Sequence, residues 1–258
     1  MERLTAILRC PRCAAALERT ARDLRCAACG ARANAGGVVD LAGEPRAPRS
    51  LGARVMASRA MAAVYEAAWR PAAFALSTGF RMPKADDEAA IVLDRLAGCA
   101  GPWLDLSCGP GAMTRRLCAA ARGELVVAVD LSAAMLDRAK RAAPDAALVR
   151  ADALALPFVD GAFGAVVNLA ALDLYPDAAR AVREAARVLR RGGRWIASAF
   201  VVDDVVARDS KPHRALTAVT SIHLLGKRHL EAIARSAGLT AFASRSFGTY
   251  VIAWAEKA

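Results

Sequence analysis

The sequence has no uninterrupted apolar stretch of about 18 residues, so we expect no membrane-spanning helix. It begins Met1-Glu2-Arg3-Leu4, with an acid and no apolar region, which excludes a secretory signal peptide. Without export, disulfides are not expected, and the seven cysteines are predicted to be reduced thiols or metal ligands. We therefore expect a cytoplasmic protein.

Lysine is scarce. Of the 36 basic residues, 31 are arginine and five are lysine, in a chain with a net charge of +11. Such a composition follows from a GC-rich genome whatever the function, so the charge alone does not indicate a nucleic-acid partner. Residues 1–60 nevertheless carry 11 arginines against five acids, which leaves a polyanion as a second candidate partner for this segment. The length of 258 residues fits one α/β domain and a small appendage.

Two Cys-x-x-Cys motifs lie 12 residues apart near the N-terminus, at Cys10–Cys13 and Cys26–Cys29. Four thiolates on two tight turns form a tetrahedral site that suits Zn²⁺. A redox Cys-x-x-Cys would occur singly at a strand-to-helix junction, so the doubled motif favours a metal. Four thiolates leave no open coordination position, so the zinc is expected to be structural. The predicted ribbon covers residues 1–43, with strands at 4–8 and 23–25.

A proline-interrupted, charged segment at 44–53 predicts a linker. Residues 54–78 then have helical character and an aromatic stripe. The stripe is formed by Tyr65, Trp69 and Phe74, with Phe80 beyond it. Such a stripe is usually core, but in residues 54–100, ahead of the first strand of the next domain, it can also cover a substrate pocket.

From residue 103 onward, strand-like and helix-like stretches alternate, which predicts an α/β fold with a parallel sheet covered on both faces. Two final strands meet at Gly248 and predict an antiparallel hairpin at the sheet edge. The expected fold is a doubly wound sheet of seven strands, five of them parallel, in a domain spanning 101–258. The predicted strands are 103–107, 124–130, 146–150, 163–168, 193–200, 240–247 and 249–255. The predicted helices are 111–121, 132–143, 177–190 and 227–237, and Arg187–Gly193 is expected to end the third of these with a glycine cap.

The segment Asp105–Gly111 (Asp-Leu-Ser-Cys-Gly-Pro-Gly) follows the first strand and precedes a helix. Two glycines around one residue allow a tight turn whose backbone approaches a ligand closely. Asp130 ends the second strand, where an acid is placed to accept hydrogen bonds from ribose hydroxyls. These features predict a nucleotide site.

A dinucleotide fingerprint needs a third glycine three residues after the second, and Thr114 occupies that position. The pattern acid-x-x-x-Gly-x-Gly is instead the one that holds S-adenosylmethionine (SAM). Asp105, Asp130 and Asp152 follow three successive strands and favour SAM over a purely structural turn.

The chain resembles the class I SAM-dependent methyltransferases of the ubiquinone/menaquinone type over roughly residues 60–256. With its cysteine ribbon it is similar to the zinc-ribbon methyltransferases of bacteria and plant plastids, and more distantly to the guanine-N1 methyltransferase of large-subunit ribosomal RNA. The resemblance rests on Trp103–Gly111, Asp130, Arg150–Ala153, Leu156–Phe158, Arg187–Gly193, Tyr65–Arg70 and Gly79-Phe80. Arg191 departs from the pattern, since relatives usually have proline there.

The resemblance implies a set of SAM-binding residues. The methionine end of SAM would lie against the turn, the ribose on Asp130, and the adenine on Leu131, Asp152 and Ala153. Asn168 and Leu169 would form the floor near the methyl group. The full set of implied cofactor-binding residues is Asp105, Ser107, Gly109, Gly111, Asp130, Leu131, Asp152, Ala153, Asn168 and Leu169.

The sequence indicates the residues around the methyl acceptor less clearly. Methyl transfer always needs a nucleophile in line with the methyl group, but it needs a general base only if the acceptor must lose a proton. Candidate catalytic residues are Asp173 and Tyr175 after the fourth strand, and His213 and His223 in an insert at 201–226 after the fifth.

Three functions remain open. The leading one is methylation of a small molecule, in secondary-metabolite or quinone-like biosynthesis. The second is methylation of ribosomal RNA docked on the basic ribbon, although the ribbon has no aromatic residue that could stack on a base. The third is a non-catalytic SAM-binding partner protein.

Overall fold

The computed structural model describes residues 1–20, 23–34, 36–42, 83–202, 223 and 225–258, together with the single residues 55, 58 and 60. The predicted linker at 44–53, most of the predicted helix at 54–78 with its aromatic stripe, Phe80, His213 and most of the 201–226 insert lie outside these residues. Within the described residues, no helix combines the length and the apolar character needed to cross a membrane.

A mixed sheet forms the body of the molecule, and the described residues contribute nine strands to it in the order β11-β12-β9-β8-β5-β6-β7-β4, with β10 beside β9. The strands from β4 to β9 run parallel, and β11 and β12 are antiparallel. Their bounds are Val38–Asp40 (β4), Trp103–Leu106 (β5), Val126–Asp130 (β6), Ala147–Arg150 (β7), Phe163–Asn168 (β8), Leu189–Val202 (β9), Leu225–Gly226 (β10), Leu239–Phe247 (β11) and Tyr250–Lys257 (β12).

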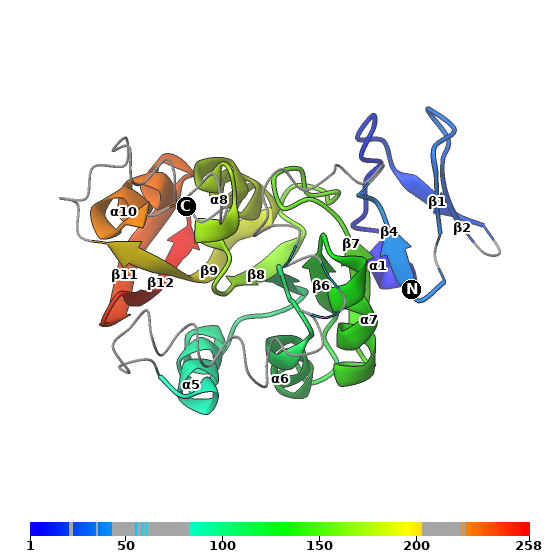
Figure 1. Ribbon diagram of the computed structural model, residues 1–258. Helices are drawn as coiled ribbons and strands as arrows, with labels where there is room; N and C mark the ends of the chain where they lie inside the picture. The colour runs from blue at the N-terminus through cyan, green and yellow to red at the C-terminus, as the bar shows by residue number, and fades with distance from the viewer. Residues whose placement is uncertain are drawn as a thin grey trace.

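Helices cover both faces of this sheet, as Figure 1 shows: α8 and α10 lie on one face, and α5, α6 and α7 on the other. Apolar residues at helical spacing explain these positions, since α8 buries Ala178, Val182 and Ala185 along one side. The helices are Ala85–Leu96 (α5), Ala112–Ala120 (α6), Ala133–Ala142 (α7), Ala178–Val188 (α8) and Lys227–Ser236 (α10). The predicted doubly wound fold with a terminal antiparallel hairpin is confirmed.

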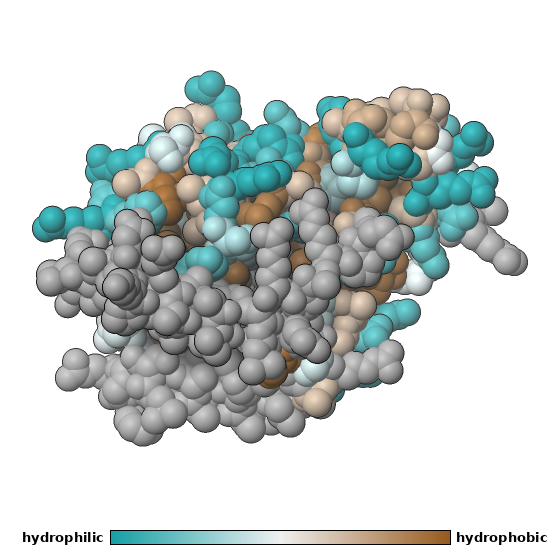
Figure 2. Space-filling view, turned by 45° about the horizontal axis from the view of Figure 1, so that its top comes forward, coloured by the Kyte–Doolittle hydropathy of each residue, from teal (hydrophilic) through white to brown (hydrophobic). Residues whose placement is uncertain are grey.

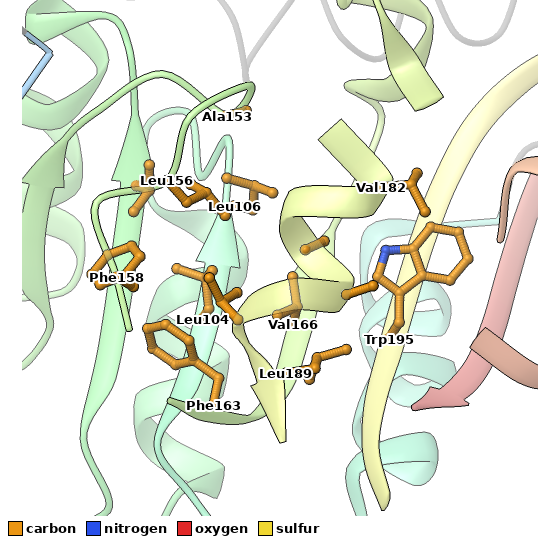
Figure 3. Close-up of a cluster of buried hydrophobic side chains, with 14 of the residues drawn as sticks. Leu104, Leu106, Ala153, Leu156, Phe158, Phe163, Val166, Val182, Leu189 and Trp195 are labelled. Atoms are coloured by element: carbon orange, nitrogen blue, oxygen red, sulfur yellow. The ribbon is translucent and has the colours of Figure 1, made fainter. Parts of the chain in front are cut away.

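The core beneath α8 explains why the central strands read as continuous apolar runs. Leu104, Val166 and Trp195 are fully buried and come from three neighbouring strands. In Figure 3 Trp195 lies beside Val182, which projects from α8, while Leu104 and Val166 lie nearer Phe163. Because helices cover the central strands on both faces, apolar residues are needed on each side of the sheet.

A small antiparallel sheet precedes the main sheet and consists of Leu17–Arg19 (β1), Asp23–Cys26 (β2) and Arg32–Asn34 (β3). The predicted strand at 23–25 is confirmed, but the strand predicted at 4–8 is wrong. Glu2–Thr5 instead forms a helical turn, α1, which buries Leu4. Leu4, Ile7 and Leu8 recur at the i, i+3, i+4 spacing of a helix and do not alternate with polar residues as a strand would require.

Two further elements differ from the expectation. β4 pairs in parallel with β7 and extends the main sheet beyond the seven predicted strands. The helix α8 ends at Val188 and is followed by Leu189 in an extended conformation, so the glycine cap predicted after Arg187 is wrong. Gly192 has a φ of +70° but lies within β9.

The described surface in Figure 2 is largely hydrophilic, with hydrophobic residues visible between polar ones. Leu131 is one exposed large hydrophobic residue, with 55% of its surface exposed. An exposed leucine directly after a buried strand is a candidate ligand contact.

Candidate functional site

The turn after β5 contains three residues with positive φ: Ser107 at +57°, Gly109 at +54° and Gly111 at +91°. Ser107 takes a conformation that costs a residue with a side chain of order 1 kcal/mol or more. A backbone hydrogen bond fixes the turn to the neighbouring strand β6, because the Cys108 N–H donates to the carbonyl of Val129 at 2.9 Å. The turn leads directly into α6, with Gly111 as its N-cap residue.

The two glycines of this turn have different surroundings. Among the described residues, a Cβ at Gly109 would meet no atom within 4 Å, so this side of the turn leaves room for a ligand. A Cβ at Gly111 would lie 2.8 Å from the Cα of Ala139 in α7. Gly111 is thus required where the turn packs against a helix, whereas we had expected both glycines to serve ligand approach.

Asp105 is buried at the end of β5, and its carboxylate accepts a hydrogen bond from the Thr114 hydroxyl at 2.6 Å. Burial raises the pKa of Asp105 to about 7, although the Thr114 hydroxyl opposes this shift. Thr114 occupies the position of the missing third glycine. Sequence reasoning missed its role, which a hydroxyl nine residues after a buried acid could have indicated.

Asp130 ends β6 beside this turn. One carboxylate oxygen accepts the Gly109 N–H at 2.9 Å, and the other accepts the Ser132 N–H at 2.8 Å. Desolvation raises the pKa of Asp130, while these backbone N–H groups lower it. A carboxylate has about four acceptor sites, so two stay available for a ligand.

The residues predicted to surround adenine follow β6 and β7 at the same edge of the sheet. Leu131 is exposed, Ala153 is buried and Asp152 is half-buried. Asp152 accepts the Leu154 N–H at 2.9 Å through one oxygen. The fold brings the three segments together, because Asp130 pairs with Arg150 across β6 and β7.

Tyr175 links the turn after β5 to the end of β8 through hydrogen bonds with Ser107 and Asn168. The Tyr175 hydroxyl lies 2.6 Å from the Ser107 Oγ and accepts the Asn168 side-chain N–H at 3.0 Å. Asn168 is buried and also donates to the Leu106 carbonyl at 2.7 Å. Burial raises the pKa of Tyr175, so its hydroxyl stays protonated at neutral pH. Leu169 follows at the strand end and is half-buried.

Asp173 lies in a short 3₁₀ turn, Leu172–Leu174, after β8. It is 4% exposed, and its Oδ1 has no hydrogen-bond partner among the residues that the structure describes. Desolvation raises its pKa to about 6. The His223 backbone N–H donates to the Asp173 carbonyl at 2.6 Å, so the structure brings these two predicted residues together.

A buried polar chain near the ends of β8 and β9 was not predicted. The Ser198 hydroxyl lies 2.5 Å from the Tyr250 hydroxyl and accepts the Ala170 N–H at 2.9 Å. The Tyr250 hydroxyl in turn donates to the Glu88 carboxylate. Ser198 and Glu88 are the available sequence signals, since both are polar residues in otherwise apolar patterns.

Four cysteines form a second candidate site. The Sγ atoms of Cys10, Cys13, Cys26 and Cys29 all lie within 4.8 Å of one another, with 3.6 Å between Cys10 and Cys29 and 3.4 Å between Cys13 and Cys26. Such spacing fits four sulfur ligands around one tetrahedral ion, whose metal–sulfur distances are about 2.3 Å for zinc.

The two cysteine turns repeat the same backbone pattern. Cys10 N–H donates to the Ala15 carbonyl and Cys26 N–H to the Ala31 carbonyl, both at 2.8 Å. The residue after each second cysteine has positive φ, at +59° for Ala14 and +71° for Gly30. The Cys29 backbone N–H lowers the pKa of Cys26, which favours the thiolate form that metals bind. At Cys13 the Ala15 backbone N–H also acts to lower the pKa, but hydrogen bonds to the other thiols outweigh it, so the pKa of Cys13 is raised.

Residues 104–197 match a family described as a methyltransferase domain. An uncharacterized chloroplastic methyltransferase of Arabidopsis thaliana is 30% identical over 224 residues, which cover 81% of this chain and 62% of the relative. A demethylmenaquinone methyltransferase of Beutenbergia cavernae is 40% identical over 97 residues, 38% of this chain and 40% of the relative. The chain thus spans less than two thirds of either relative's length.

The geranyl diphosphate C-methyltransferase of Streptomyces coelicolor has a similar structure, with a TM-score of 0.57 and 21% sequence identity. The match covers 67% of this chain and 76% of that enzyme. At this level of identity the similarity establishes the fold of the sheet and its helices.

Proposed function

The chain belongs to the class I SAM-dependent methyltransferases, related to plastid and menaquinone methyltransferases, and on this premise we propose that it methylates a small-molecule acceptor. One relative is named for a small molecule, demethylmenaquinone, which supports this class of acceptor. The observation that carries the proposal is the convergence of Asp130, the exposed Leu131 and Asp152 at the carboxyl edge of adjacent strands. That edge is where ligands bind in open α/β sheets.

Each residue of this edge has a role in the proposal. Asp130 accepts from the ribose hydroxyls with its two available acceptor sites, and Leu131 packs on the adenine ring. Asp152 accepts from the adenine amino group. When bound, SAM supplies a methyl group on a positively charged sulfur. Asn168 and Tyr175, already fixed by their mutual hydrogen bond, form a rigid floor beside it.

The binding step is tested by calorimetric titration of the full chain with SAM. Measurable saturable binding is expected, and its absence would end the methyltransferase proposal. A titration with ribosomal RNA fragments over a salt series then tests the acceptor class. Sub-micromolar affinity at physiological salt with a steep salt dependence would overturn a small-molecule acceptor.

Asp173 is proposed as the general base for an acceptor that must lose a proton. Its Oδ1 is buried and has no partner in the described part of the chain, and a pKa of about 6 makes the carboxyl group ionised but basic at neutral pH. Tyr175 stays protonated and acts as a positioning residue. A pH profile of kcat/KM is therefore expected to rise through about pH 6 and to level above it. A profile that is flat between pH 5 and 8 would exclude this role.

The same residue predicts a change in stability. The native pKa of Asp173 lies above its ordinary value of 3.8, so the native state loses stability as pH rises from 3.8 to about 6. Asp173→Asn removes the buried charge and should raise the free energy of unfolding by about 1–3 kcal/mol at pH 7 while lowering kcat. Urea unfolding at pH 4 and 7 measures this gain, which should be absent at pH 4. Asp145→Asn, at an exposed aspartate, is the control and should change neither quantity.

The four-cysteine cluster is proposed to bind structural Zn²⁺, because four thiolates suit zinc and leave no position for a substrate. Cys26→Ser is expected to lower the melting temperature by roughly 10 °C and to abolish stoichiometric zinc. Calorimetry and elemental analysis measure both. The control is Cys118→Ser, a cysteine of α6 outside the cluster, which should keep its zinc. An unchanged melting temperature in the Cys26 variant would contradict the structural role.

A further inference from the structure

The ribbon contacts the main domain at the two segments assigned above to adenine. One contact joins β4 to Arg150, whose side chain reaches the Leu131 carbonyl, and the other joins residues 7–9 to the loop that follows Asp152. Figure 1 shows β4 directly beside β7, at the edge of the sheet nearest the ribbon. These contacts tie the cysteine cluster to the proposed cofactor site.

Arg150 is the centre of the first contact. It ends β7 between Asp130 on β6 and Asp40 on β4, which are its register partners on the two sides. Its Nε donates to the Leu131 carbonyl at 3.0 Å, and its Nη1 donates to the Asp40 carboxylate at 2.9 Å. The Arg150 side chain is 14% exposed and that of Asp40 is 45% exposed, so the guanidinium is buried while the carboxylate that pairs with it reaches solvent. Asp40 thereby fixes the guanidinium that holds Leu131.

The second contact supports the loop after β7. The Arg9 N–H donates to the Pro157 carbonyl at 2.8 Å, and the Val159 N–H donates to the Ile7 carbonyl at 2.9 Å. Leu8 forms an antiparallel bridge with Phe158, and both side chains are 1% exposed. This two-stranded pairing closes the loop that begins at Asp152 and Ala153.

The chain connects both contacts to the cysteine cluster. Residues 7–9 immediately precede Cys10, and β4 follows β3, which begins three residues after Cys29. A metal ion bound by the cluster fixes the two ends of the ribbon relative to each other, and through them the two adenine-binding segments.

We propose that metal binding by the ribbon increases the affinity of the main domain for SAM. Asp40 and Arg150 act as positioning residues that transmit this effect to the adenine-binding segments. The inference rests on the proposed function. Coupling between two sites is reciprocal, so bound SAM must also tighten metal binding by the same factor.

The test is calorimetric titration of the full chain with SAM in the zinc-loaded and chelator-treated states, with circular dichroism to monitor folding. Removal of zinc is expected to weaken SAM binding about tenfold or more. Asp40→Asn and Arg150→Met in the zinc-loaded protein should each weaken it about three- to tenfold with zinc content unchanged. Competition with a chromophoric chelator should show tighter zinc binding in the presence of SAM.

Arg3→Gln is the matched control. Arg3 also connects the ribbon to the main domain, pairing with Glu124 at 2.7 Å, but it does so before the start of β6, at the opposite end of the strand from Asp130. This variant should leave SAM affinity within about twofold of the parent chain, as expected for an exposed ion pair.

The outcomes separate the two proposals. Equal SAM affinity in the zinc-loaded, zinc-free and Asp40→Asn proteins would overturn the coupling while leaving the methyltransferase assignment intact. Absence of SAM binding in every form would overturn the proposed function itself. If zinc removal unfolds the main domain, the Asp40→Asn and Arg3→Gln pair decides, because equal weakening in both would show a general loss of docking and contradict the positioning role.

Discussion

Replacing Asp130 with alanine is expected to weaken SAM binding by about 100-fold or more. A hydrogen bond to a charged group contributes about 1.5–3 kcal/mol, and the proposed ribose contact contains two of them. Together they correspond to at least two factors of ten in the dissociation constant. Isothermal titration calorimetry with SAM measures the change directly.

The Asp130→Ala variant also loses the acceptors of the Gly109 and Ser132 N–H groups, so its stability must be measured alongside binding. A cost of about 1–3 kcal/mol is expected for these backbone groups, which leaves the domain folded at 20 °C. Asp137→Ala, at an exposed aspartate of α7, is the control for loss of one negative charge. A dissociation constant within threefold of the parent value would show that Asp130 does not hold the ribose.

Exchanging each glycine of the turn for alanine should separate folding from binding. Gly111→Ala places a Cβ 2.8 Å from the Ala139 Cα at a φ of +91°, and we expect a loss of about 3 kcal/mol in the free energy of unfolding. Gly109→Ala places a Cβ that meets no atom of the described residues within 4 Å, so it should cost only about 1 kcal/mol for its positive φ. Its methyl group enters the open side of the turn, so SAM binding should weaken about tenfold.

Urea unfolding and SAM titration of both variants measure the two effects. Each variant serves as the control for the other, because both add one methyl group to a glycine with positive φ. Equal stability losses would show that α7 moves to accommodate the extra atom. Unchanged SAM affinity in Gly109→Ala would show that the cofactor does not approach this side of the turn.

Much of the fold follows from local sequence. The apolar runs at β5, β6 and β8 and the polar breaks between them predicted the order of strands and helices, because strands covered on both faces must be apolar throughout. The two Cys-x-x-Cys motifs predicted the cluster, because each motif supplies two thiolates from one tight turn and the two motifs lie close together in the chain. The one strand that was predicted wrongly, at 4–8, lies in a short segment with no strand-like alternation.

The details of the site depended on long-range contacts that no local pattern encodes. Tyr175 bonds to Ser107 across 68 positions of the chain, and Asn168 donates to the Leu106 carbonyl across 62. The contact between Asp40 and Arg150 spans 110 positions and exists only because β4 adds to the main sheet.

The sequence alone therefore determined the class of fold, the methyl donor and the cysteine cluster, because each depends on residues close together in the chain. Only the tertiary structure decided that Gly111 serves helix packing while Gly109 faces open space, and that the ribbon docks on the segments assigned to adenine. These properties depend on which atoms meet after distant strands have paired, and burial then determines which carboxylates carry a raised pKa.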